Sequence, residues 1–217
     1  MTTYTAAVFE NGMVARLLDS LVAAGSPAPN SHAQDEIDRV NRVLCSNASV
    51  AAALPNATLT ALLDLLSEGL GDPTVRRPPA GFLRRLEEVA GQTPLPDFLE
   101  ATASALRASQ RRGIRALDDL PLSVWEAKLR FSQLESFSWW VEGDEYDTFE
   151  EGVVAGIGSE HPYGCADRLP PLISECHAAR LLDKGSIASL HAVVPWATPP
   201  VLVEILRLAS AHLLEAH

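Results

Sequence analysis

The stretch LPNATLTALLDLLSEGL, residues 54–70, decides the fold class of this chain. Its leucines recur at steps of three and four residues, which is the spacing of one face of an α-helix. A second stretch near the C-terminus repeats the pattern. Each helix is apolar on one side only, so each needs a neighbour to cover that side. The apolar positions are Leu59, Leu62, Leu63, Leu66 and Leu70 in the first stretch, and Leu202, Ile205, Leu206, Ala209 and Leu213 in the second.

The composition favours helices in the rest of the chain. Of the 217 residues, 47% are hydrophobic, 21% are charged and 6% are aromatic, so aliphatic side chains must fill most of the interior. Ala and Leu are the best helix formers, and no segment shows the sustained alternation of a half-buried strand. The sequence therefore predicts an all-α fold with little or no sheet. It would be a helical bundle or a short irregular solenoid of stacked, HEAT-like helix pairs.

Possible caps and a faint repeat accompany these helices. The stretches 54–66 and 194–206 share Pro, Ala, Thr and core leucine positions. They indicate either repeated helix pairs or the recurrent use of proline in a first turn. Three pairs also have the spacing of a capping box, in which side chains bond free amides of the first turn: Ser31 with Gln34, Ser123 with Glu126, and Thr148 with Glu151.

We expect one all-helical domain over residues 1–217, because a chain of this length can bury a sizeable core. Segments rich in Pro, Gly and Asp interrupt the helices. One of them, GDPTVRRPPAG at 71–81, is rich in Arg and Pro. It offers a division into N-terminal (1–70) and C-terminal (82–217) helical subdomains.

The chain is acidic, with a net charge of -11 and a pI of about 4.9. Acidic surfaces repel phosphates, so general nucleic-acid binding and adhesion to anionic membranes are disfavoured, and a protein with a basic surface is the favoured partner. Only two of the 17 basic residues are lysines, which predicts a GC-rich, bacterial coding sequence. Three cysteines and an N-terminus unlike a signal peptide predict a reducing, cytoplasmic location.

A tryptophan pair followed by carboxylates marks the segment SWWVEGDEYDTFEEG, residues 138–152. The segment lacks the ligand spacing of a calcium loop. Exposed aromatic side chains anchor interfaces and charges steer the encounter, so the segment is a predicted binding surface for a basic partner. The alternative is that both tryptophans lie in the core. The predicted binding residues are Trp139, Trp140, Glu142, Asp144, Glu145, Tyr146, Asp147, Glu150 and Glu151.

The stretch HPYGCADRLPPLISECH, 161–177, holds two of the three cysteines and two of the six histidines. Thiolate and imidazole are zinc ligands, but the close ligand pairs of structural zinc sites are missing. Cys176 and His177 are adjacent on a predicted helix and so point about 100° apart. No four-ligand site is expected, which leaves His161 and Cys165 as candidate metal ligands.

The loop EHPYGCAD at 160–167 could instead support thiol chemistry. Cys165 precedes a predicted helix, whose amides would favour the thiolate. His161 or His177 would act as the base and Asp167 would orient it. No cofactor motif is present, so no cofactor is expected. The remaining internal histidines are predicted to be partly exposed helix positions: His32, His191 and His212.

An arginine-rich stretch forms a second candidate surface. It has no glycine-rich phosphate loop and no interleaved aromatic residues. We expect its arginines to pair with acids of the same chain or to be solvated, although a contact with 142–151 of a second copy would build an oligomer. The residues of this basic patch are Arg76, Arg77, Arg84, Arg85, Arg107 and Arg111.

Three functions from different classes fit these features. The first is a non-enzymatic protein-interaction module, an adaptor or an immunity- or antitoxin-like protein that binds a basic partner through the tryptophan and acidic segment. The second is an enzyme centred on Cys165, with or without zinc. The third is a structural subunit of a homo- or hetero-oligomeric assembly. No complete catalytic motif is found, which favours the first.

Overall fold

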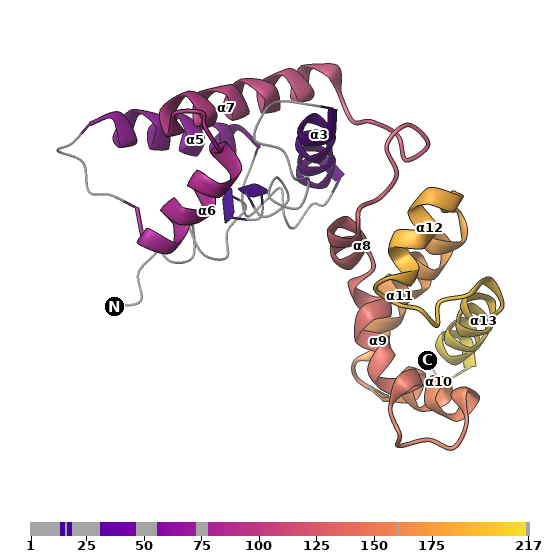
Figure 1. The fold of residues 1–217 in the computed structure, drawn as a ribbon. Helices are drawn as coiled ribbons and strands as arrows, with labels where there is room; N and C mark the ends of the chain where they lie inside the picture. The colour runs from indigo at the N-terminus through magenta and orange to yellow at the C-terminus, as the bar shows by residue number, and fades with distance from the viewer. Residues whose placement is uncertain are drawn as a thin grey trace. The chain divides into compact units, whose positions relative to one another are not determined.

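The computed structural model describes residues 14–15, 17–18, 31–46, 56–72, 78–159 and 161–215. Ten helices cover most of these residues, and no strand occurs among them (Figure 1). The prediction of an all-α fold is therefore confirmed. Among the helices described, none is both long enough and apolar enough to cross a bilayer.

The chain divides into two compact units, residues 1–115 and 116–217. The Arg- and Pro-rich segment 71–81 lies within the first unit. Arg115 is therefore the last residue of one unit and Ala116 the first residue of the next.

The first unit is arranged around α7 (Leu95–Arg112), which packs against all three other helices described there (Figure 1). Its main neighbour is α5 (Asn56–Gly71), whose predicted stripe contributes the fully buried Leu59 and Leu63. The other two helices are α3 (Ser31–Ser46) and α6 (Ala80–Ala90).

An ion-pair network joins α3 to the C-terminal end of α7. Asp38, with a side chain only 5% exposed, accepts a hydrogen bond of 2.9 Å from Arg112. Arg115 lies 2.8 Å from Asp35 and 3.5 Å from Asp38. Arg42 donates to the Arg115 carbonyl oxygen at 3.2 Å. These contacts hold the last residue of the first unit by both its side chain and its backbone.

The second unit is a bundle of six helices around one apolar core. Within it, α11 packs against α13 and α9, α10 packs against α9 and α13, and α12 packs against α8. Leu202, Ile205 and Ala209 of the predicted C-terminal stripe are buried in this core. The helices are α8 (Val124–Arg130), α9 (Ser132–Glu142), α10 (Phe149–Gly158), α11 (Cys165–Arg180), α12 (Lys184–His191) and α13 (Pro199–Glu215).

Helices α9 and α10 approach so closely that glycine is required between them. A Cβ on Gly152 would lie 2.1 Å from the carbonyl oxygen of Trp140. A Cβ on Gly156 would lie 2.7 Å from the ring of Phe137. At Gly152 backbone therefore packs directly on backbone, which fixes the helix that carries both tryptophans against α10, where the acidic segment ends.

Predicted caps account for the starts of two helices. Ser123 and Glu126 form a complete capping box at α8, with hydrogen bonds of 3.3 and 3.1 Å. At α10, the hydroxyl of Thr148 accepts from the Glu151 amide at 3.2 Å. The predicted Ser31 cap depends on a side chain outside those that the structure describes.

The start of α9 is capped from another helix. The carboxylate of Glu175 on α11 accepts from the backbone amides of Gln133, at 2.9 Å, and Leu134, at 3.0 Å. This contact satisfies amides that have no partner within α9. Burial raises the pKa of Glu175, and its hydrogen bonds from these amides only partly offset that effect.

The structure corrects the expected start of α11. Cys165 is the first residue of the helix and not part of the loop before it, so the break covers only 159–164. Pro170 and Pro171 lie inside the helix with their rings exposed. Packing of a continuous apolar stripe outweighs the loss of their two amide donors. The buried stripe is Cys165, Leu169, Leu172, Cys176 and Ala179.

Candidate functional site

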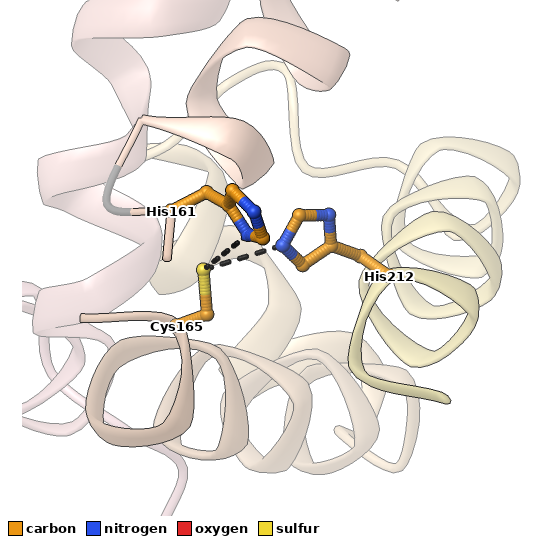
Figure 2. A group of neighbouring side chains, drawn as sticks. All are labelled: His161, Cys165 and His212. Atoms are coloured by element: carbon orange, nitrogen blue, oxygen red, sulfur yellow. Dashed lines mark hydrogen bonds between the residues drawn. The ribbon is translucent and has the colours of Figure 1, made fainter. Parts of the chain in front are cut away.

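Two imidazoles and one thiol meet in the second unit. The Sγ atom of Cys165 lies 3.2 Å from Nε2 of His212 and 4.0 Å from Nδ1 of His161. The two imidazole rings stand nearly perpendicular, with centroids 5.2 Å apart. Figure 2 shows both rings directed toward the sulfur. We call these three residues the Cys–His cluster.

Each member of the cluster is placed by the packing of its own segment. Cys165 begins the buried stripe of α11 and its side chain is fully buried. His212 follows the buried Ala209 by three residues on α13, and so lies over the same face. His161 is exposed in the turn that leads into α11. Since α11 packs on α13, the start of one helix meets the end of the other.

The other residues predicted for thiol or metal chemistry lie elsewhere. His177 is exposed in the last turn of α11, and twelve helical residues place it about 18 Å from Cys165 along the axis. Asp167 is exposed in the first turn. Cys176 is buried as predicted, and burial followed by the nearby charge of Glu175 raises its thiol pKa to about 12. Neither His177 nor Asp167 belongs to the cluster.

His212 is the member that sequence reasoning missed, because it was predicted only as a partly exposed helix position. Its side chain is indeed half-buried. The sequence did indicate that His212 could face inward, because it lies three residues after Ala209 and so extends the buried stripe of α13 by one turn. In the same way, extending the buried stripe of α11 four residues back from Leu169 reaches Cys165, which would have placed Cys165 on that helix.

The space beside the cluster is small. A cavity of about 20 Å³ is lined by Cys165, Phe137, Ile157 and Leu172, among others. That volume accommodates roughly one water molecule. Neither histidine of the cluster lines this cavity.

The predicted tryptophan pair is divided between surface and core. Trp139 is 68% exposed on α9. Trp140 packs against the core of the second unit and lies 6.2 Å, between ring centroids, from the half-buried Tyr146. Only Trp139 therefore has the exposure that was predicted for a binding anchor.

The acidic side chains around Trp139 are all exposed, and none makes an ion pair with any residue that the structure describes. Glu142 lies three residues after Trp139 and so on the same side of α9. We call this set the Trp139 surface: Trp139, Glu142, Asp144, Glu145, Asp147, Glu150 and Glu151.

The predicted basic patch in the first unit is partly neutralised. Arg107 forms an ion pair with Asp64 of α5. Arg84 and Arg111 are exposed, and Arg85 is half-buried. Arg76 and Arg77 lie outside the described residues.

The comparisons with family models, with curated proteins and with solved structures find no match to this chain.

Proposed function

We propose that this protein is a protein-interaction module, an adaptor or an immunity-like protein, that binds a basic partner through the Trp139 surface. The single observation that carries the proposal is the exposure of Trp139, at 68%, beside carboxylates that form no ion pair within the described part of the chain. Three free cysteines accord with action in a reducing compartment.

An exposed tryptophan supports binding because it can bury a large apolar area with few lost rotamers. Trp139 is presented rigidly, since the adjacent Trp140 packs into the core and Gly152 fixes α9 against α10. A preorganised anchor loses little entropy when a partner covers it.

The charge of the second unit supports a basic partner. Residues 116–217 contain 16 acidic and 6 basic side chains, a net charge of -10, whereas residues 1–115 contain 12 and 11, a net charge of -1. Nearly all of the net charge of -11 therefore lies on the unit that carries the Trp139 surface. Such a field would accelerate encounter with a positive surface and weaken with added salt.

The experiment is co-purification from the native host, followed by affinity measurement on the purified partner with wild-type protein and two variants. Trp139→Ala should weaken binding by roughly 30-fold or more, the loss usual for a central aromatic anchor. The matched control is Leu181→Ala, because Leu181 is also exposed, at 86%, in the same unit. It should bind as the wild type does.

The free energy of unfolding tests whether Trp139→Ala acts on binding alone. We expect it to change by less than about 0.5 kcal/mol, because the side chain is mostly solvated. The proposal fails if the partner binds Trp139→Ala with unchanged affinity, or if binding is insensitive to salt. A partner that proves to be a second copy of this chain would support the assembly hypothesis in its place.

A further inference from the structure

We propose that the Cys–His cluster is a binding site for a divalent transition metal ion of the zinc class. Sγ of Cys165 and one ring nitrogen from each of His161 and His212 all lie within 4.8 Å of one another. Thiolate and imidazole are the donors that zinc prefers. The site is independent of the Trp139 surface, so the two proposals can fail separately.

The distances within the cluster fit a tetrahedral ion. With the usual zinc bond lengths to sulfur and nitrogen, two ligands at the tetrahedral angle lie about 3.6 Å apart. The two sulfur–nitrogen distances, 3.2 and 4.0 Å, lie on either side of that value. In Figure 2 the two imidazoles converge on the sulfur from different segments, so that an ion could contact all three with small rotations of the rings.

The surroundings of Cys165 favour a metal ligand over a nucleophile. A nucleophilic thiol must be accessible to its substrate, whereas the Cys165 side chain is fully buried. An ion bound between three side chains needs no substrate pocket. The exposed ring of His161 also leaves one side of the cluster open to solvent, from which water can complete four-coordination.

Binding requires only the loss of a proton. The Cys165 thiol releases its proton to solvent and binds as a thiolate, while each neutral imidazole binds through a nitrogen lone pair. No change of oxidation state is involved, because zinc is redox-inert. The bound ion would tie the turn before α11 and the first residue of α11 to the last turns of α13.

The test uses cobalt(II) as a spectroscopic probe on the full chain, purified with a chelator and a reducing agent. We expect one cobalt ion per chain, a thiolate-to-cobalt charge-transfer absorption, the intense visible bands of four-coordinate cobalt, and displacement by zinc. Cys165→Ser and His212→Asn should abolish the charge-transfer band or weaken cobalt binding by at least about 10- to 100-fold. His161→Asn should weaken it as well, and because this residue is exposed its substitution leaves the fold intact.

Two variants serve as controls. Cys45→Ser removes an exposed thiol of the first unit, and His177→Asn removes an exposed histidine of α11. Both should bind cobalt as the wild type does. The proposal is overturned if wild-type protein shows no charge-transfer band, or if the band persists in Cys165→Ser or survives unchanged in both histidine variants.

A thermal measurement gives an independent readout. Zinc at about 100 times its dissociation constant should raise the unfolding midpoint of the wild type, followed by tryptophan emission, by roughly 10 °C. The midpoint of His161→Asn should move little. An equal shift in wild type and His161→Asn would place the metal elsewhere and contradict the proposal.

Discussion

The two compact units differ in how their charged residues are balanced and paired. In the first unit, acids and arginines are nearly equal in number, and Asp38 of α3 pairs with Arg112 at the end of α7 and with Arg115 just beyond it. In the second unit, acids outnumber basic residues by ten, and the carboxylates around Trp139 are exposed. Charge contributes to cohesion in the first unit. In the second unit an apolar core supplies most of the cohesion, and apart from carboxylates such as Glu175, which caps α9, most acidic side chains face solvent.

All four tryptophans lie in the second unit, so the two units can be followed separately. Tryptophan emission reports unfolding of residues 116–217 only. Far-UV circular dichroism reports helices of both units. A transition seen in circular dichroism but not in emission belongs to the first unit.

The largest effect should come from breaking the close helix crossing of the second unit. Gly152→Ala places a Cβ 2.1 Å from the Trp140 carbonyl, where backbone must move to accommodate it. We expect a loss of about 3 kcal/mol or more in the free energy of unfolding, measured by urea titration with tryptophan emission. Gly158→Ala on the same helix is the control. Outside its chain neighbours and its own helix backbone, no atom of the described residues lies within 4 Å of its added Cβ, so Gly158→Ala should be neutral or slightly stabilising. Equal midpoints for the two variants would contradict the packing described.

The next effect should appear in the first unit, at Asp38. Burial raises the pKa of Asp38, but the side chains of Ser109, Arg112 and Gln34 outweigh it and hold the pKa below the usual value of 3.8. Because the folded pKa is lowered, the contribution of Asp38 to stability is present above pH 3.8 and is lost as the pH falls through the folded value.

Asp38→Asn should therefore destabilise the first unit by about 1–3 kcal/mol at pH 7 and have a smaller effect in acid. The measurement is urea unfolding by circular dichroism. Tryptophan emission should not change. Glu87→Gln is the control, since Glu87 is exposed on α6. An effect of Asp38→Asn that does not depend on pH would refute the role of its charge.

The smallest effect concerns Glu175 of the second unit. Its pKa is shifted in the opposite direction from that of Asp38, so its contribution to stability changes with pH in the opposite direction. Its folded pKa is raised above 4.5, chiefly by burial. The folded state therefore holds this proton more tightly, and the contribution of Glu175 to stability falls as the pH rises from 4.5 through the folded value. Glu175→Gln keeps an acceptor oxygen for the α9 amides, so the loss near pH 4.5 should be below about 1 kcal/mol.

The measurement for Glu175→Gln is the difference in free energy of unfolding from wild type, by tryptophan emission, between pH 4 and pH 7. As the pH rises, the wild type should lose stability relative to the variant. A wild type that gains relative stability would mean that the amide hydrogen bonds outweigh burial. Asp38 and Glu175 would then respond to pH alike, and the contrast between the units would disappear at these two sites.

Local patterns in the sequence predicted most of the fold. The leucine steps of 54–70 correctly located α5, and the Ser123 and Thr148 caps correctly located the starts of α8 and α10. These features depend on residues within one or two turns of each other, which is why a single sequence contains them. The start of α11 was placed too late because Pro170 and Pro171 are typical of a helix's first turn. In the structure they lie inside the helix, where their exposed rings leave the buried stripe continuous.

The candidate sites were less predictable, because they depend on the register between helices. His161 and Cys165 are four residues apart, and their proximity follows from local geometry. His212 is 47 residues from Cys165, and only the packing of α13 on α11 brings it to the sulfur. Likewise, adjacent tryptophans necessarily point in different directions on a helix, but which of them faces solvent depends on where α10 packs against α9.

The separation of thiol and indole groups between the units has a practical consequence. Among the three cysteines, only Cys45 is exposed, and it belongs to the first unit, whereas every tryptophan belongs to the second. A thiol-reactive acceptor dye would therefore attach to one unit while the donor emission arises in the other. Resonance energy transfer in the unsubstituted protein would then report any change in the separation of the two units when a partner or a metal ion binds.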